Sequence, residues 1–396
     1  MQNITEQIIA LVKNNISNAN DSCVQFSDQS YNPLIFNKNN FHEIKKVEEN
    51  SEKSTESGKS ADFLCSGKSS KDFLGLLSQT LLPQTFLGSL ERTFEPNNKI
   101  AFIDGGSAEI LKSSNFSLSL IRIYYTIYQK NKRINSKKQD FYAFVYAKNI
   151  NHELFYEAEF IGLSNDALPD KNDLLFNSLD ATIKNGITRA NISNVSDVIR
   201  RFSEIKTAVN IINNLGGNDI IVFDGSLQCT FTNEKKYLDE LYKKASEKNI
   251  IVCGLSKTTA LMTDKGNSIS SALSRFNIGG KWLYHPIAEI KNPAHKAEMA
   301  FVKLHEKSKH TFRFEIFKEQ REKLSEVVSL LSENCKDSVF LGYPYALIEA
   351  DKNARISNQE KDMLLTLFSV KFGKDWEKIK QSLSNLDAHE ILDNIG

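Results

Sequence analysis

From about residue 99 onward, short apolar segments alternate with polar connections in a pattern typical of a mixed α/β domain. Residues 99–103 (KIAFI) predict a buried strand that stops at the Asp-Gly-Gly-Ser of residues 104–107. Residues 117–128 and 141–147 are rich in β-branched and aromatic side chains, and the polar, basic stretch between them predicts a β-hairpin with a basic tip. The first three strands are therefore expected to form an antiparallel meander.

A helix and two parallel strands are predicted next. Apolar side chains recur at helical spacing from Val198 to Ile212, and Gly216-Gly217 can end that helix. Residues 220–223 form a continuous apolar run that leads into Asp224-Gly225, and a helix over 234–248 precedes a second run at 250–253. Strand–helix–strand order with two-sided burial indicates parallel pairing. The whole order suits a ribonuclease H-like mixed sheet flanked by helices.

The remaining segments divide the chain into three parts. We predict further strands at 282–290, 310–317 and just before Pro344, with helices over 319–332 and 358–370. Arg313 and Glu315 are interpreted as paired surface or edge-strand charges. At the N-terminus, residues 3–17 predict a short amphipathic helix and the polar residues 37–72 a flexible linker. The predicted division is an N-terminal extension (1–95), the main domain (96–375) and a polar tail (376–396).

Composition and charge narrow the class of protein. Of the 396 residues, 40% are hydrophobic and 25% charged, which excludes wholesale disorder and fibrous classes. A net charge of +1 excludes a generally basic nucleic-acid coat protein, so any DNA contact must use a local patch. No apolar run approaches the roughly 20 residues that cross a bilayer. The start lacks a secretory signal, and five scattered cysteines without a C-x-x-C pair favour a reducing cytoplasm.

Two aspartates, each before a glycine at the end of a predicted strand, are the first candidates for chemistry. Asp104 and Asp224 would lie at one rim of the sheet, where open α/β folds place their ligands. Glu204, at the edge of the helix's apolar stripe, could face the same rim. The alternatives are two ordinary Asp-Gly turns and an exposed helix glutamate. If the three converge, a divalent cation must offset their repulsion, and oxygen ligands favour Mg²⁺ or Mn²⁺. Two such ions would support phosphodiester cleavage.

Several motifs in order resemble those of the NurA family, DNA nucleases of archaea and bacteria that work with the HerA hexameric translocase. The resemblance covers roughly residues 95–370 and rests on these segments: IDGGS at 103–107, RRFSEIKTAVNII at 200–212, IIVFDGSL at 220–227, GLSK at 254–257 and GYPYALIEADKNARIS at 342–357. It implies a ribonuclease H-like fold, a homodimer, dependence on two Mn²⁺ (or Mg²⁺) ions, and degradation of single-stranded DNA and double-strand ends in DNA repair.

The same resemblance assigns residues to roles. Asp104, Glu204 and Asp224 match the family's acidic metal ligands, and Tyr343 matches the tyrosine of its late Gly-Tyr-Pro motif. Eight residues further on, where characterised relatives carry a metal-site histidine, this chain has Asp351. An aspartate can bind a hard cation but cannot act as a neutral imidazole ligand or proton shuttle.

Basic residues supply candidates for DNA contact. Lys257, after the strand at 250–253, could face the scissile phosphate, and its alternative is a solvated loop lysine. The stretch 130–138 could contact phosphates or could be a solvated hairpin tip; its basic residues are Lys130, Lys132, Arg133, Lys137 and Lys138.

Three functional hypotheses follow, from different classes. The first is a metal-dependent DNA nuclease partnered with a HerA-type ATPase. The second is a weakly active or inactive NurA-like subunit that binds DNA and the translocase, motivated by Asp351. The third is an actin-like or sugar-kinase-like ATPase, which would need a second phosphate loop and an adenosine motif that the sequence lacks.

Overall fold

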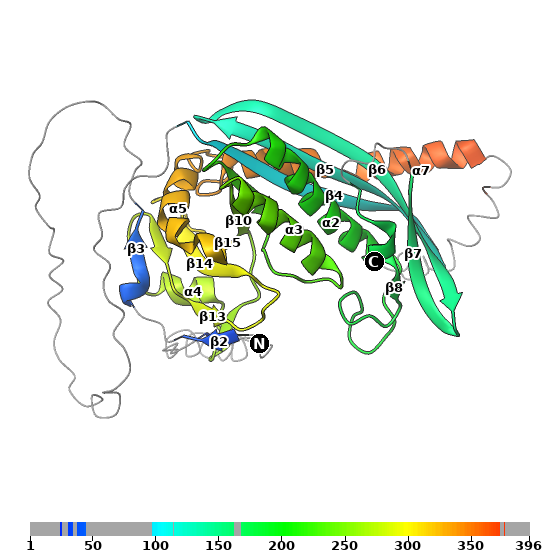
Figure 1. The fold of residues 1–396 in the computed structure, drawn as a ribbon, viewed down its shortest axis with the longest axis horizontal. Coiled ribbons are helices and arrows are strands. Elements are labelled where there is room, and N and C mark those ends of the chain that lie inside the picture. Colours follow the sequence, from blue (N-terminus) through cyan, green and yellow to red (C-terminus); the bar gives the residue numbers. More distant parts are fainter. Residues whose placement is uncertain are drawn as a thin grey trace, which may run out of the picture.

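A long mixed β-sheet forms the centre of the protein (Figure 1). The computed structural model describes residues 24–25, 31–34, 38–44, 97–113, 115–161, 168–372 and 376. In spatial order, the eleven strands are β3 (Phe41–Glu43), β12 (Trp282–Tyr284), β14 (Ala297–Lys303), β15 (Phe312–Phe317), β10 (Ile251–Ser256), β9 (Ile220–Asp224), β4 (Lys99–Lys112), β5 (Phe116–Gln129), β6 (Lys132–Ile150), β7 (Glu153–Ile161) and β8 (Phe176–Asn177).

The predicted meander and parallel strands are confirmed. β4, β5 and β6 pair antiparallel, whereas β9 pairs parallel with both β4 and β10. The order β6-β5-β4-β9-β10, with a helix between β9 and β10, is the mixed arrangement expected for a ribonuclease H-like sheet. On the far side of β10, β15, β14, β12 and β3 extend the sheet by antiparallel pairing.

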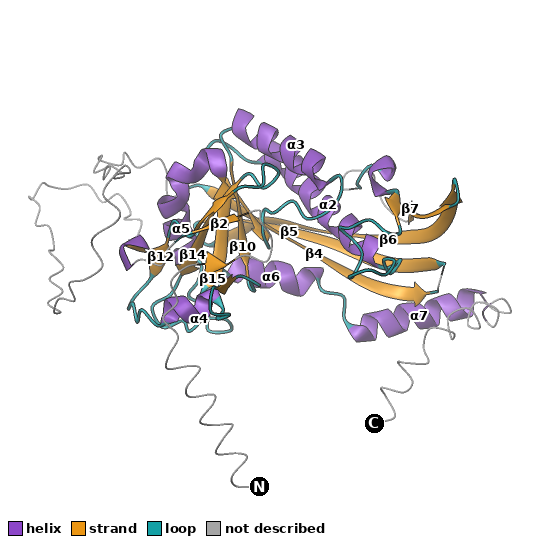
Figure 2. Ribbon diagram, turned by 90° about the horizontal axis from the view of Figure 1, so that it is seen from below, coloured by secondary structure: helices purple, strands orange, loops and turns teal. Residues whose placement is uncertain are grey.

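Helices cover both faces of the sheet (Figure 2). α2 (Asn194–Ile211) and α3 (Glu234–Glu247) pack together on one face, with Phe202 of α2 stacked on Tyr237 of α3. α6 (Tyr345–Ala354) and α7 (Asn358–Phe372) lie on the other face, against β4 and β5. α5 (Leu324–Glu333) and α6 contribute to one apolar core, and α4 (Ile269–Ser274) packs beside β12 and β14.

The structure corrects the predicted end of the first strand. β4 does not stop at residues 104–107 but continues to Lys112, paired with β5 throughout. The two glycines serve close packing there instead of a turn. A Cβ atom on Gly105 would lie 2.5 Å from Glu204 Oε1 of α2, and one on Gly106 would lie 2.2 Å from the carbonyl oxygen of Ala354 in α6. Successive residues of a strand point to opposite faces, so each glycine admits a different helix.

The basic connection is also more regular than expected. Only Lys130 and Asn131 form the turn between β5 and β6, both with positive φ, and Lys132 already belongs to β6. The two strands therefore extend almost to the tip of the hairpin, and most of the basic stretch lies along a strand.

Several later predictions need correction. The predicted strand 282–290 is split into β12 and β13 (Ala288–Ile290) around Pro286, which has no N–H to donate to a ladder. The strand expected before Pro344 is a loop that leads into α6. The helix predicted over 319–332 begins with a 3-10 turn, Lys318–Lys323, before α5. β7, β8 and β14 were not predicted, whereas α7 confirms the helix expected over 358–370.

Part of the N-terminal extension joins the main domain. Within the predicted linker 37–72, residues 38–44 are described and contain a 3-10 turn and β3, which pairs with β12. That part is therefore a strand at the end of the main sheet. β1 (Val24–Gln25) pairs with β11 (Met262–Thr263), and β2 (Tyr31–Pro33) pairs with β13. The helix predicted over 3–17 and nearly all of the tail 376–396 lie outside the described residues.

Within the described ranges, every helix is too short or too polar to cross a bilayer.

Candidate metal centre

Asp104 and Asp224 lie side by side although 120 positions separate them. β4 and β9 run parallel, with Ile103 opposite Phe223. The next residue of each strand is an aspartate, which places Asp104 beside Asp224. β9 ends at Asp224, whereas β4 continues along β5. The end of β9 thus leaves room beside Asp104, which is where a ligand can approach two strand carboxylates at once.

Asp351 completes a group of three carboxylates. One oxygen of each of Asp104, Asp224 and Asp351 lies within 4.8 Å of the others. Asp351 belongs to α6, and the missing side chain of Gly106 lets that helix approach β4. Only oxygen ligands are present in the group, and carboxylate oxygens suit hard divalent cations such as Mg²⁺ and Mn²⁺. The donor set therefore fits a divalent metal ion.

The electrostatics of the group favour a cation. Burial, followed by the charges of Asp224 and Glu204, raises the pKa of Asp104 to about 8. Burial also raises the pKa of Asp224, although Lys257 and Tyr343 oppose this. Both aspartates therefore hold a proton more tightly than an ordinary carboxyl group when no metal ion is bound. A metal ion would take the place of those protons.

Lys257 and Tyr343 both contact Asp224. Lys257 Nζ lies 2.7 Å from Asp224 Oδ2 and 2.6 Å from Asp351 Oδ1, so its ammonium group bridges the two. Tyr343 is fully buried and donates its hydroxyl to Asp224 Oδ1 at 2.8 Å. The Lys257 ammonium also lies 5.5 Å from the centre of the Tyr343 ring. These contacts fix the orientation of the Asp224 carboxylate.

Glu204 occupies a different position from the other three acids. Its Oε1 accepts a hydrogen bond from Arg200 Nη1 at 2.8 Å, and Arg201 Nη1 lies 3.7 Å from Oε2. Glu204 is only 4% exposed, close enough to Asp104 to raise the pKa of that residue. It therefore borders the group of three carboxylates while its own charge is paired with two arginines.

Two charged side chains, Arg201 and the buried Glu315, hold the turn after Asp224. Arg201 donates to the carbonyl oxygen of Ser226 at 2.9 Å, and the backbone N–H of Leu227 donates to Glu315 Oε2 at 2.7 Å. A Cβ atom on Gly254 would lie 2.4 Å from the carbonyl oxygen of Gly225, so the neighbouring strand also requires glycine. The turn that carries Asp224 is thus fixed from three sides.

Arg313 and Glu315 were expected to be paired charges on the surface or on an edge strand, and that position is wrong. The two residues are paired, but β15 lies between β14 and β10 and both side chains are buried. His295 Nε2 lies 3.2 Å from Glu315. Although burial alone would raise the pKa of Glu315, Arg313 and His295 hold it at about 2. Alternation of apolar and charged residues could not reveal that this strand is internal.

The basic residues of the hairpin lie outside the carboxylate group. All five are exposed, and they are spread from the β5–β6 turn along β6. Arg133 Nη1 forms an ion pair with Glu349 Oε1 of α6 at 2.9 Å. Their predicted role in DNA contact remains a prediction.

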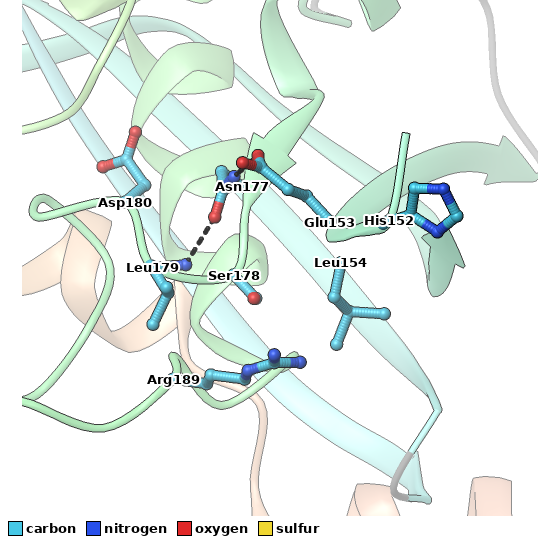
Figure 3. Close-up of a pocket in the computed structure, with 8 residues that line it drawn as sticks. All are labelled: His152, Glu153, Leu154, Asn177, Ser178, Leu179, Asp180 and Arg189. Carbon is cyan, nitrogen blue, oxygen red and sulfur yellow. Dashed lines mark hydrogen bonds between the residues drawn. The ribbon is translucent and has the colours of Figure 1, made fainter. Parts of the chain in front are cut away.

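A separate cavity of about 310 Å³ lies where the β6–β7 hairpin meets β8 (Figure 3). Its carboxylates already have partners, since Glu153 accepts from Asn177 and Asp180 accepts from Thr182. The cavity shares no residue with the carboxylate group. Its lining residues are His152, Glu153, Leu154, Asn177, Ser178, Leu179, Asp180 and Arg189.

Comparison with known families identifies the domain that contains these carboxylates. The family model described as the NurA domain matches residues 98–356. The chain belongs to the NurA family. This match spans the carboxylate group together with Glu204, Lys257 and Tyr343, which confirms the resemblance seen in the sequence and makes the chain a member of a nuclease family.

Solved structures resemble this NurA-family chain only distantly. The NurA nuclease from Sulfolobus solfataricus is 15% identical, with 70% of this chain and 85% of that chain covered and a TM-score of 0.42. The catalytic domain of human Endonuclease V is 11% identical, with 68% of this chain and 87% of that chain covered and a TM-score of 0.35. Argonaute of A. aeolicus is 8% identical, with 65% of this chain and 28% of that chain covered and a TM-score of 0.30. No curated protein sequence matches the chain.

Proposed function

We propose that this protein is a divalent-metal-dependent deoxyribonuclease, a phosphodiester hydrolase. One observation carries the proposal: Asp104, Asp224 and Asp351 bring carboxylate oxygens within 4.8 Å of one another inside a NurA domain. Three half-buried acids at this spacing repel one another, and a bound divalent cation would offset that repulsion.

The proposed cofactor is Mn²⁺ or Mg²⁺, with two ions at work. Asp104, Asp224 and Asp351 would hold one ion, and Glu204 would hold the second ion or its water. When bound, such ions supply Lewis acidity and a nucleophilic water at neutral pH. Glu204 would have to exchange its contact with Arg200 for this role.

The remaining proposed catalytic roles fall to Lys257 and Tyr343. Lys257 is one-third exposed, so its ammonium can balance charge that develops on the scissile phosphate. Tyr343 would keep Asp224 in the orientation that binds metal, through the hydrogen bond at 2.8 Å. The exposed basic residues of the β5–β6 hairpin would contact phosphates further along the DNA, and each such contact makes binding salt-sensitive.

The proposed substrates and partners rest on the family. We propose that the protein degrades single-stranded DNA and resects double-strand ends in DNA repair. It would work in the cytoplasm as a homodimer with a HerA-type hexameric ATPase. The ATPase would deliver the strand, and the carboxylate group would cut it.

Cleavage of end-labelled single-stranded DNA with Mn²⁺ tests the proposal. We expect cleavage by the wild-type protein and its loss in Asp104→Ala and Asp224→Ala. Asp362→Ala, which removes an exposed carboxylate from α7, is the matched control and should retain activity. Equal cleavage by all four proteins would place the active site elsewhere.

A specific contact favours a second candidate function, a weakly active or inactive NurA-like subunit that binds DNA and the translocase. Lys257 already forms ion pairs with Asp224 and Asp351, in a chain that carries an aspartate in place of the family's histidine. Tight DNA binding without cleavage in Mn²⁺, Mg²⁺ or Co²⁺ would support this candidate over the first.

A further inference from the structure

An open groove of about 440 Å³ lies at the start of α6, beside the β5–β6 turn. Four segments form it: the end of β5, the start of β6, the end of α5 with the loop that follows, and the first residue of α6. Its lining residues are Tyr128, Asn131, Arg133, Glu333, Asn334, Lys336, Asp337 and Tyr345. The metal centre uses none of them.

The groove combines an aromatic ring with a cation. Tyr345 is 43% exposed, unusual for a tyrosine whose neighbours on α6 pack into the core, and the Arg133 side chain is 56% exposed. Bases stack on exposed aromatic rings, and guanidinium groups bind phosphates or stack on bases. An unpaired nucleotide needs both kinds of contact.

The acidic residues in the groove have partners of their own. Glu333 is paired with Lys281 at 3.4 Å and with Lys336 at 2.6 Å. Asp337 accepts the backbone N–H of Val339 at 2.8 Å. Asn334 caps the first turn of α6, accepting from Ala346, and donates to Asn131. The floor of the groove is thus fixed by its own contacts.

Strand β5 runs from beside the metal centre to the groove. Glu349 of α6 accepts hydrogen bonds from both Tyr124 and Arg133. Tyr124 is the register partner of Asp104, and Tyr128 at the groove lies four residues further along β5, about 13 Å at ~3.3 Å per residue. A strand of DNA can span that distance with a few nucleotides.

We propose that this groove binds an unpaired nucleotide of the strand being cut, with its base against Tyr345 and its phosphate against Arg133. The inference rests on the proposed nuclease function and assigns it a second binding point a few nucleotides from the scissile bond. It predicts a preference for single-stranded DNA, because a paired base cannot turn away from its partner to stack on Tyr345.

The test uses the full chain and oligothymidylate with one 2-aminopurine at successive positions, with Ca²⁺ in place of Mn²⁺. We expect the wild-type protein to quench the fluorescence at one position most strongly, and Tyr345→Leu to abolish that position effect. Binding by Tyr345→Leu should be at least about fivefold weaker, the lower end of measured stacking effects. Tyr146→Leu, which removes a half-buried tyrosine on β6, is the control and should bind normally.

A second variant tests the phosphate contact separately. Arg133→Gln should lower the slope of log affinity against log salt by about one unit. Lys243→Gln, which changes an exposed lysine of α3, should leave the slope unchanged. In cleavage assays with Mn²⁺, both groove variants should raise KM and leave kcat nearly unchanged.

The outcomes separate this inference from the nuclease proposal. Normal cleavage by the wild-type protein, with unchanged fluorescence, binding and KM in Tyr345→Leu, would overturn the groove and leave the nuclease proposal intact. A wild-type protein that neither binds nor cleaves single-stranded DNA would overturn both.

Discussion

Arg200 and Glu204 form an ion pair one helical turn apart on α2, with Nη1 and Oε1 separated by 2.8 Å. Glu204 lies outside the group of three carboxylates whose oxygens are within 4.8 Å of one another, and its partner is an arginine of its own helix, whereas Asp224 and Asp351 share Lys257. The structure therefore places one potential cation position among three acids, and a second one beside Glu204 only after Arg200 has moved.

Because Asp104 lies inside the group of three carboxylates and Glu204 outside it, their substitution should affect Mn²⁺ binding differently. Asp104→Asn should remove the tighter Mn²⁺ binding, because it takes a ligand from the group of three. Glu204→Gln should keep one tight ion and lose cleavage by about 100-fold or more, if the second ion is needed for chemistry. Calorimetric titration with Mn²⁺ gives the stoichiometry of each variant. Loss of all tight binding in Glu204→Gln would contradict this arrangement.

Removing the charge of Lys257 should raise the affinity for Mn²⁺ and lower the rate of cleavage. Its ammonium competes with a metal ion for Asp224 and Asp351, at 2.7 and 2.6 Å. Lys257→Met keeps the aliphatic stem and removes the charge, so Mn²⁺ affinity should rise several-fold, because the acids lose their internal counterion. Cleavage at saturating Mn²⁺ should fall by about 100-fold, because the phosphate loses a cation. Lys243→Met controls for loss of a surface lysine. Weaker Mn²⁺ binding by Lys257→Met would show that the lysine organises the site instead.

The raised pKa of Asp104 predicts how pH affects the metal-free protein. Its pKa is about 8 in the folded protein against 3.8 for an ordinary aspartate, so the folded state holds the proton more tightly. As pH rises from about 4 to 8, the unfolded chain loses this proton first, and the free energy of unfolding falls. Asp104→Asn removes that loss. In EDTA, its melting temperature relative to wild type should therefore be higher at pH 8 than at pH 5, by a few degrees. An equal difference at both values would contradict the shift.

Gly106 predicts the effect of separating α6 from the sheet. A Cβ atom there would lie 2.2 Å from the backbone oxygen of Ala354, so Gly106→Ala must push α6 and Asp351 away from β4. We expect a loss of about 1–3 kcal/mol in the free energy of unfolding and weaker Mn²⁺ binding. Gly279→Ala is the matched control, since nothing lies within 4 Å of its Cβ position. Urea denaturation of both variants measures the difference.

The sequence predicted the strands and helices that pair or pack locally. The apolar runs that become β9 and β10 and the helical spacing of α2 are strong periodic signals, so Asp224 and Glu204 could be placed from them. Asp104 was identified for a partly wrong reason. The two glycines after it indicated a turn, but the strand continues, because the glycines make room for α2 and α6. Only the packing of distant segments reveals that use.

Other features of the site depend on tertiary structure alone. Asp351 became a candidate only through the family resemblance. The segment with Gly342 and Pro344 was interpreted as the end of a strand, and the helix that follows it and carries Asp351 was not predicted. The buried pair of Arg313 and Glu315 has the pattern of an exposed strand, and no local signal shows that β15 lies in the middle of the sheet. Lys257 and Asp351 form their ion pair across 94 positions of the chain, and sequence spacing does not encode such a contact.

Binding of Mn²⁺ to the metal-free full-length protein, followed by electron paramagnetic resonance, tests the central claim most directly. The account predicts tight uptake by the wild-type protein and by the Asp362→Asn control. It also predicts loss of that uptake in Asp104→Asn, Asp224→Asn and Asp351→Asn, provided that circular dichroism shows each variant to be folded. Unchanged Mn²⁺ uptake in folded forms of these three variants would contradict the claim that their carboxylates form a metal site.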